Sequence, residues 1–185
     1  MLILNFELTK EDYFKFYYYT VWLAPEKKTA AIKSRVKTFL LFTLAFSMIK
    51  FATSPHNFDF FFFYTLLVLA SIYVLPLFSI ENSSRKQALA FYNDPLNANT
   101  FLQTEIIFSE TGIFGKYSYA EVNYKWNCIN KKVETTEHFL LYISSNQAII
   151  IPKREIKTET DKSKLLELFG KHITFNAEVG HLVKN

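Results

Sequence analysis

The longest uncharged segment of this chain extends from Phe60 to Ile80 and consists mainly of Phe, Leu, Val, Ile and Tyr. At about 1.5 Å of rise per residue, a helix of this length is roughly 30 Å long, which matches the hydrocarbon core of a bilayer. A wholly buried helix of a small soluble domain, the alternative, rarely needs such a length. We therefore predict a membrane-spanning helix over residues 60–80.

A second apolar segment, from Val36 to Thr53, precedes it and would form a helix of about 27 Å. The loop between them, residues 54–59, contains no Lys or Arg, whereas both are frequent over residues 27–37 and occur again at 85–86. Lys and Arg tend to remain on the cytoplasmic side of a membrane. The pattern predicts a transmembrane hairpin over residues 36–80, in a multi-pass protein of the cell (plasma or inner) membrane with both termini cytoplasmic.

Residues 1–35 are expected to form a cytosolic segment of one strand and one helix. Residues 1–8 alternate between two faces, one of them apolar, which is typical of a strand. Thr9 is followed three positions later by Asp12, as at a helix N-cap, so a helix is expected from about Lys10 to Leu23. That helix is aromatic nearly all round. Two positions are open for it: the headgroup region of a membrane, or a place on the soluble domain.

Beyond a helical segment that ends near Asn93, the hydrophobic period changes. Four segments are rich in β-branched and aromatic residues and are separated by turn-forming residues: 100–110, 112–126, 138–146 and 147–156. They are typical of successive strands of an antiparallel sheet. Asp161 then precedes an apolar stripe at helical spacing, which predicts a helix capped by Asp161. The predicted β domain covers residues 97–170, and residues 171–185 form a tail.

These segments together predict an α+β fold. It would combine a transmembrane helical hairpin, with spans at 36–53 and 60–80, and a small antiparallel β-sheet domain closed by a C-terminal helix. A chain of 185 residues has room for such a hairpin and one compact domain, and not for two domains of ordinary size.

Residues that could carry chemistry are few and scattered. Cys128 is the only cysteine in the sequence, which excludes an intrachain disulfide and a multi-thiolate metal site, and we expect it to be a half-buried strand residue. The histidines lie far apart and in no catalytic motif: His56, His138, His172 and His181. We therefore expect no enzyme activity, no metal and no cofactor. A net charge of +4 is modest for a nucleic-acid-binding protein, so no nucleic-acid partner is expected.

Five short motifs are distributed along the chain: Leu8 to Tyr13, Ser109 to Ile113, Trp126 with Ile129, Phe139 to Tyr142, and Ile150 to Arg154. In this order, with two apolar segments after the first motif, the sequence resembles the YcxB-like family of bacterial membrane proteins as far as about Gly170. The resemblance implies a cytosolic PH-like β domain carried on a membrane hairpin. It implies no particular activity.

Two of these motifs contain candidate functional residues. Four cations could contact an anionic headgroup or an acidic partner beside the inner leaflet: Lys131, Lys132, Lys153 and Arg154. The alternative is a solvated strand end. Trp126 and Pro152 are expected to be structural, with Trp126 closing the end of a curled sheet or packing in the core, and Pro152 at a strand end or sheet edge.

The sequence therefore predicts a membrane-anchored interaction or regulatory module. The alternatives are a lipid-headgroup-binding accessory subunit of a membrane complex and, with less support, a small transporter component. The expected partners are the lipid bilayer and an unidentified protein. Neither the ligand nor the oligomeric state follows from the sequence.

Overall fold

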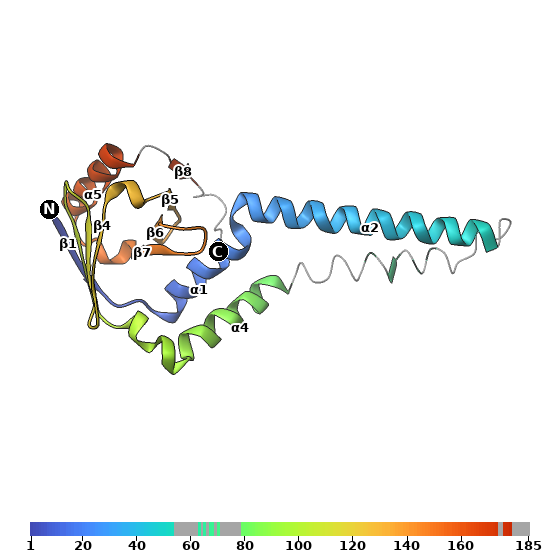
Figure 1. Cartoon of the computed structure of the whole chain (residues 1–185), viewed down its shortest axis with the longest axis horizontal. Coiled ribbons are helices and arrows are strands. Elements are labelled where there is room, and N and C mark those ends of the chain that lie inside the picture. Colours follow the sequence, from blue (N-terminus) through green and yellow to red (C-terminus); the bar gives the residue numbers. More distant parts are fainter. Residues whose placement is uncertain are drawn as a thin grey trace.

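The structure, a computed structural model, describes residues 1–53, 63, 65, 67–68, 70, 79–173 and 176–178. It consists of a domain built on two small β-sheets and a long helix, α2 (Pro25–Thr53), which extends away from that domain (Figure 1). The predicted α+β class is confirmed. The strands, however, form two sheets and not the single sheet that the sequence suggested.

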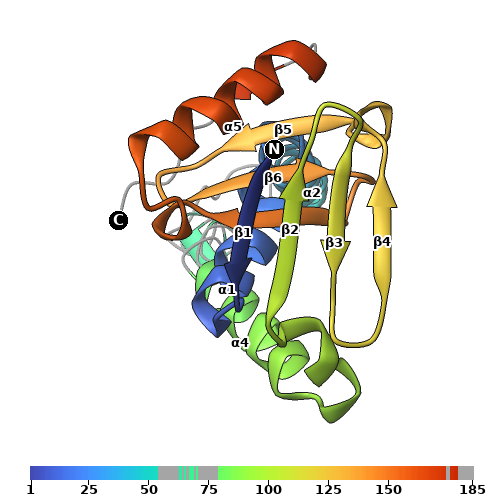
Figure 2. The ribbon, with the colours of Figure 1, turned by 90° about the vertical axis from the view of Figure 1, so that its left-hand side faces the viewer.

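The first sheet is antiparallel and has the strand order β1-β2-β3-β4, with β1 (Leu2–Phe6), β2 (Thr104–Phe108), β3 (Ile113–Lys116) and β4 (Glu121–Tyr124). The second has the order β7-β6-β5-β8, with β5 (Lys131–Glu134), β6 (His138–Tyr142), β7 (Ala148–Pro152) and β8 (Asn176–Glu178), the last parallel to β5. The strands of the two sheets cross at a steep angle (Figure 2). Because β1 pairs with β2, the N-terminal strand belongs to this domain.

The main core lies between the two sheets and explains the two kinds of strand in the sequence. Buried and exposed residues alternate along β1, which has one face on the core, whereas all five residues of β6 are buried. The second sheet is covered on both faces, because its inner face meets the first sheet and its outer face meets the N-terminal helix. A strand buried on both faces is continuously apolar, as Phe139 to Tyr142 are.

The N-terminal helix packs on this outer face. α1 (Lys10–Tyr18) begins after Thr9, whose Oγ1 accepts the backbone N–H of Asp12 (3.2 Å), as predicted. It continues into a π-helical turn, η1 (Tyr19–Leu23). Residues of α1 and η1 share a buried apolar cluster with the second sheet: Phe16, Tyr19, Val133, Leu140, Tyr142 and Ile150. The sequence left two positions open for this helix, the headgroup region of a membrane and the β domain. In the structure the helix packs on the β domain.

A second helical connection leads from α2 back to the sheets. α4 (Ile80–Asn93) lies beside α1, where the ring of Phe91 stacks on that of Tyr13 with centroids 4.9 Å apart. It ends at Asn93, as predicted, with Asp94 as its C-cap, and the 3₁₀ helix η2 (Pro95–Phe101) follows.

Helix α5 (Glu159–His172) is the expected C-terminal helix and buries Leu165, Leu168 and Phe169 in the main core. Its N-cap is Thr158, whose Oγ1 accepts the backbone N–H of Asp161 (3.0 Å). The predicted cap at Asp161 is wrong. The helix begins about one turn earlier, because the hydroxyl of Thr158 accepts the free backbone N–H of Asp161.

The predicted transmembrane hairpin is corrected by the structure. Across the described ranges, none of the helices combines the length and the apolar character that crossing a bilayer requires. The predicted first span, 36–53, is the C-terminal part of α2, and its longest uncharged segment lies between Lys37 and Lys50. The segment between these two lysines is about 18 Å long, against roughly 30 Å of hydrocarbon. The predicted second span, 60–80, lies largely outside the described residues.

Candidate functional site

The predicted basic corner is occupied by ion pairs within the chain. Arg154, in the 3₁₀ helix η4 (Lys153–Glu155), donates from Nη1 to Oδ1 of Asp12 (2.6 Å) and from Nη2 to Oδ2 (2.7 Å). Asp12 is buried, with 2% of its surface exposed. A bidentate guanidinium–carboxylate pair is among the stronger polar contacts in proteins. Arg154 therefore ties η4 to the first turn of α1.

His138 and Thr9 complete a polar centre around this carboxylate. His138 is also buried, with 2% of its surface exposed, and its Nε2 lies 2.7 Å from Oδ1 of Asp12. The backbone N–H of Thr9 donates to Oδ2 of Asp12 (2.8 Å). Burial alone would raise the pKa of Asp12, but the hydrogen bonds from His138, Arg154 and Thr9 outweigh it and hold that pKa well below its usual range. The carboxylate stays ionised, so His138 donates to it through Nε2. The sequence predicted the helix cap at Thr9 and Asp12 and the cation at Arg154, but not that Asp12 and Arg154 contact each other.

Lys153 is paired as well. Its Nζ lies 2.6 Å from Oε1 of Glu134 and 4.8 Å from the ring centroid of Phe139. Two of the four predicted cations thus have acidic partners inside the molecule, and these partners weaken their attraction for an external anion.

The other two predicted cations lie next to each other on β5, where successive side chains point to opposite faces. The ammonium of Lys132 lies 5.5 Å from the ring centroid of Phe169. Lys131 instead lines a pocket on the other side of the sheet. The four residues therefore do not form one continuous patch.

Trp126 and Pro152 have structural positions. Trp126 lies in the 3₁₀ helix η3 (Trp126–Cys128), is buried in the main core, and donates from Nε1 to the carbonyl of Ser109 (3.0 Å). Its ring stacks on His172 with centroids 5.1 Å apart. Pro152 ends β7, the edge strand of the second sheet. The expectation for Cys128 is wrong, because it lies in η3 and is exposed.

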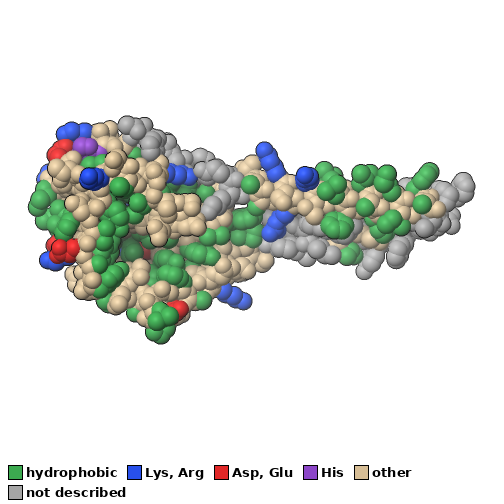
Figure 3. Space-filling model, in the orientation of Figure 1, with side chains coloured by type: hydrophobic (Ala, Val, Ile, Leu, Met, Phe, Trp, Pro, Cys, Tyr) green, Lys and Arg blue, Asp and Glu red, His purple; other side chains and the backbone are tan. Residues whose placement is uncertain are grey.

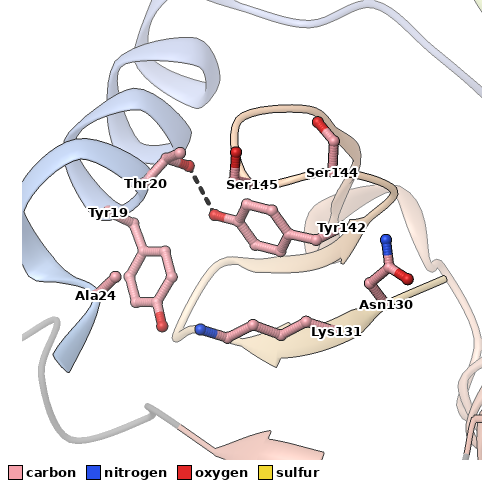
Figure 4. Close-up of a pocket in the computed structure, with 8 residues that line it drawn as sticks. All are labelled: Tyr19, Thr20, Ala24, Asn130, Lys131, Tyr142, Ser144 and Ser145. Atoms are coloured by element: carbon pink, nitrogen blue, oxygen red, sulfur yellow. Dashed lines mark hydrogen bonds between the residues drawn. The ribbon is translucent and has the colours of Figure 1, made fainter. Parts of the chain in front are cut away.

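The pocket beside Lys131 has a volume of about 290 Å³. It lies between η1, which leads into α2, and the strands β5 and β6 with the turn after β6. Figure 4 labels the eight residues that line it and shows Lys131 pointing toward the hydroxyl of Tyr19. Tyr19 and Thr20 of the π-helical turn, and Ala24 directly after it, form the wall opposite β5 and β6.

The pocket is rich in hydroxyl groups. The hydroxyls of Thr20 and Tyr142 lie 2.6 Å apart in a buried hydrogen bond, and those of Ser144 and Ser145 lie at the rim. Among the described lining residues, Lys131 carries the single formal charge and none is acidic. The site thus offers hydrogen-bond donors around one cation, the composition that suits an anion.

Helix α2 carries the second notable surface. Nine large apolar side chains on it are between 39% and 70% exposed, at Ile32, Val36, Leu40, Leu41, Phe42, Leu44, Met48, Ile49 and Phe51. At 100° per residue these positions occupy most of the helix circumference. Figure 3 shows apolar side chains along α2 and Lys and Arg side chains near its domain end. A helix exposing apolar residues all round is atypical for contact with water.

Comparisons with known proteins match only the β-rich part. Residues 108–169 match the family model described as YcxB-like protein, so the chain contains a YcxB-like domain from the end of β2 into α5. No curated protein and no solved structure matches the chain. In the part of the chain that the structure describes, no group of three or more His, Cys, Asp or Glu side chains could hold a metal ion.

Proposed function

We propose that the protein is a membrane-associated interaction module. In this proposal α2 contacts lipid through its exposed apolar surface, and the two-sheet domain with its YcxB-like part is the binding portion outside the lipid. The observation that carries the proposal is the exposed apolar surface of α2 together with the cations beside it.

The apolar surface is large enough to matter energetically. Full burial of one large apolar side chain contributes about 1.5–3 kcal/mol, so a side chain that is half exposed can still gain roughly 1 kcal/mol on entering lipid. Eight of the large apolar α2 side chains are more than half exposed, at Val36, Leu40, Leu41, Phe42, Leu44, Met48, Ile49 and Phe51. Their transfer into lipid offers several kcal/mol to association.

The charges beside the apolar surface of α2 indicate which kind of partner contacts it. Lys33 and Lys37 are exposed and Arg35 is partly exposed, all within about one and a half turns before the uncharged segment. Each cation near an anionic bilayer contributes about 1 kcal/mol. A protein groove would bury apolar residues on one side of a helix, whereas lipid accepts them all round. The combination favours an anionic lipid bilayer.

Vesicle flotation tests this proposal. The full chain is mixed with phosphatidylcholine vesicles with or without phosphatidylglycerol, and protein without vesicles controls for aggregation. The proposal predicts flotation with vesicles only, stronger with phosphatidylglycerol and weaker in high salt. The double variant Leu40→Glu, Leu44→Glu should lose flotation. The matched control, Leu96→Glu, changes a leucine that is 90% exposed on η2 and should float normally. Equal flotation of all three proteins would contradict the proposal.

A further inference from the structure

We infer that the pocket beside Lys131 is a binding site for a small hydroxylated compound that carries a phosphate group. The composition and size of the pocket do not depend on the lipid contact of α2, because the pocket is formed by η1, β5, β6 and the following turn. The choice of a soluble ligand over a lipid headgroup rests on that proposed contact. It rests on the composition, size and position of the pocket.

The composition favours phosphate. A phosphate group carries up to two negative charges at neutral pH and has three strong acceptor oxygens. Lys131 supplies a positive charge, and Thr20, Ser144 and Ser145 supply hydroxyls that can donate to those oxygens. No described lining residue is acidic, so the described wall contains no carboxylate to repel the anion.

The remaining wall suits a hydroxylated carbon skeleton. The rings of Tyr19 and Tyr142 line the pocket, and the hydrogen bond between Thr20 and Tyr142 fixes the second ring. Aromatic faces accept the C–H surface of glycerol or a sugar, while neighbouring hydroxyls bond its O–H groups. A volume of about 290 Å³ lies at the lower end of small-molecule sites, which excludes a dinucleotide.

The position of the pocket favours a soluble ligand over a lipid headgroup. Ala24 lines the pocket, and the uncharged segment of α2 starts at Thr38, about 21 Å further along the helix axis. The headgroup layer on each side of the hydrocarbon is only about 5–8 Å thick. The pocket is therefore further from the uncharged segment of α2 than this layer is thick. Glycerol 3-phosphate combines the required phosphate, hydroxyl and size, and serves as the probe.

Calorimetric titration of the full chain with glycerol 3-phosphate tests the inference, with glycerol as the uncharged control. Saturable binding of glycerol 3-phosphate and not of glycerol is expected. Lys131→Gln should weaken it about tenfold, as expected for loss of one charged contact. Lys132→Gln is the matched control, because Lys132 contacts Phe169 outside the pocket, and it should bind as the unchanged protein does. Ser145→Asp, an exposed change that adds a negative charge at the rim, should also weaken binding.

Two results would overturn the inference. One is absence of saturable binding of glycerol 3-phosphate and of inorganic phosphate to a chain whose circular dichroism shows it folded. The other is equal weakening by Lys131→Gln and Lys132→Gln. Displacement of glycerol 3-phosphate by phosphatidylglycerol vesicles, and not by phosphatidylcholine vesicles, would replace the soluble ligand with a lipid headgroup. Loss of vesicle flotation in Leu40→Glu, Leu44→Glu with unchanged glycerol 3-phosphate binding would separate this site from the lipid contact.

Discussion

Arg154 and Asp12 form a bidentate ion pair across 142 positions of the sequence. The pair joins the two motifs at the ends of the family-like pattern, the Thr-x-x-Asp cap of α1 and the Pro-Lys-Arg segment after β7. The carboxylate of Asp12 contacts both motifs. It accepts the backbone N–H of Thr9 at the start of α1, and it accepts hydrogen bonds from Arg154 and His138. Asp12 and Arg154 therefore hold the N-terminal helix on the second sheet.

We predict that Arg154→Ala destabilises the domain by about 2–4 kcal/mol. The removal of one partner leaves a buried carboxylate with fewer donors, which costs about 3–5 kcal/mol for a fully buried pair, and less here because Arg154 is 46% exposed. The midpoint of urea unfolding measures the change. Lys171→Ala breaks the exposed pair with Glu110 and should leave the urea midpoint nearly unchanged, because solvent screens an exposed pair. Similar midpoints for both variants would contradict the structural role of Arg154.

The same centre predicts loss of stability in acid. The pKa of Asp12 is lower in the folded chain than its ordinary value of 3.8, so the ionised carboxylate stabilises the fold above about pH 4. Protonation removes this contribution as the pH falls from there toward the lower folded pKa. Glu11, whose pKa is lowered by the hydrogen bond from Arg85, acts in the same direction.

Asp12→Asn should therefore flatten the acid side of the stability profile. The measurement is the urea midpoint across the acid range for the original chain and for Asp12→Asn. Asn cannot ionise, so the variant should be less stable near neutrality, and the difference should shrink as the pH falls. A constant difference at every pH would show that the Asp12 charge does not contribute.

Lys153→Gln is predicted to leave vesicle flotation unchanged within about twofold. Lys153 pairs with Glu134 inside the molecule, so its charge adds little to attraction by anionic lipid. The double variant Lys33→Gln, Lys37→Gln should weaken flotation, because both residues are exposed beside the apolar surface of α2. The reverse order of effects would restore the basic corner as the lipid contact.

Features that depend on neighbouring residues were predictable from the sequence. The Thr9 cap, the end of α4 at Asn93 and the β-rich segments all depend on local hydrogen bonds and on side-chain alternation. The N-cap of α5 was misplaced because Thr158 and Asp161 both suit a helix start, and only the geometry shows which oxygen meets the free amide.

Features that depend on distant partners were not predictable. Nothing near Arg154 in the sequence indicates Asp12 as its partner, and the alternation along a strand does not show which sheet contains it. The pocket beside Lys131 depends on the π-helical turn η1, which has no simple sequence signal. The hairpin prediction failed at its first span because Lys37 and Lys50 leave only residues 38–49 uncharged between them, and no described helix is long and apolar enough to cross a membrane.

The most direct test of lipid contact by α2 places a polarity-sensitive fluorophore on Leu44→Cys, in a chain with Cys128→Ser because Cys128 is exposed. Leu96→Cys, labelled in the same background, is the control on η2, outside α2. Vesicles containing spin-labelled lipid are then added to the full chain. Lipid contact by α2 predicts a blue shift and strong quenching at position 44, with neither at position 96. Unchanged emission at position 44, or equal quenching at both positions, would contradict it.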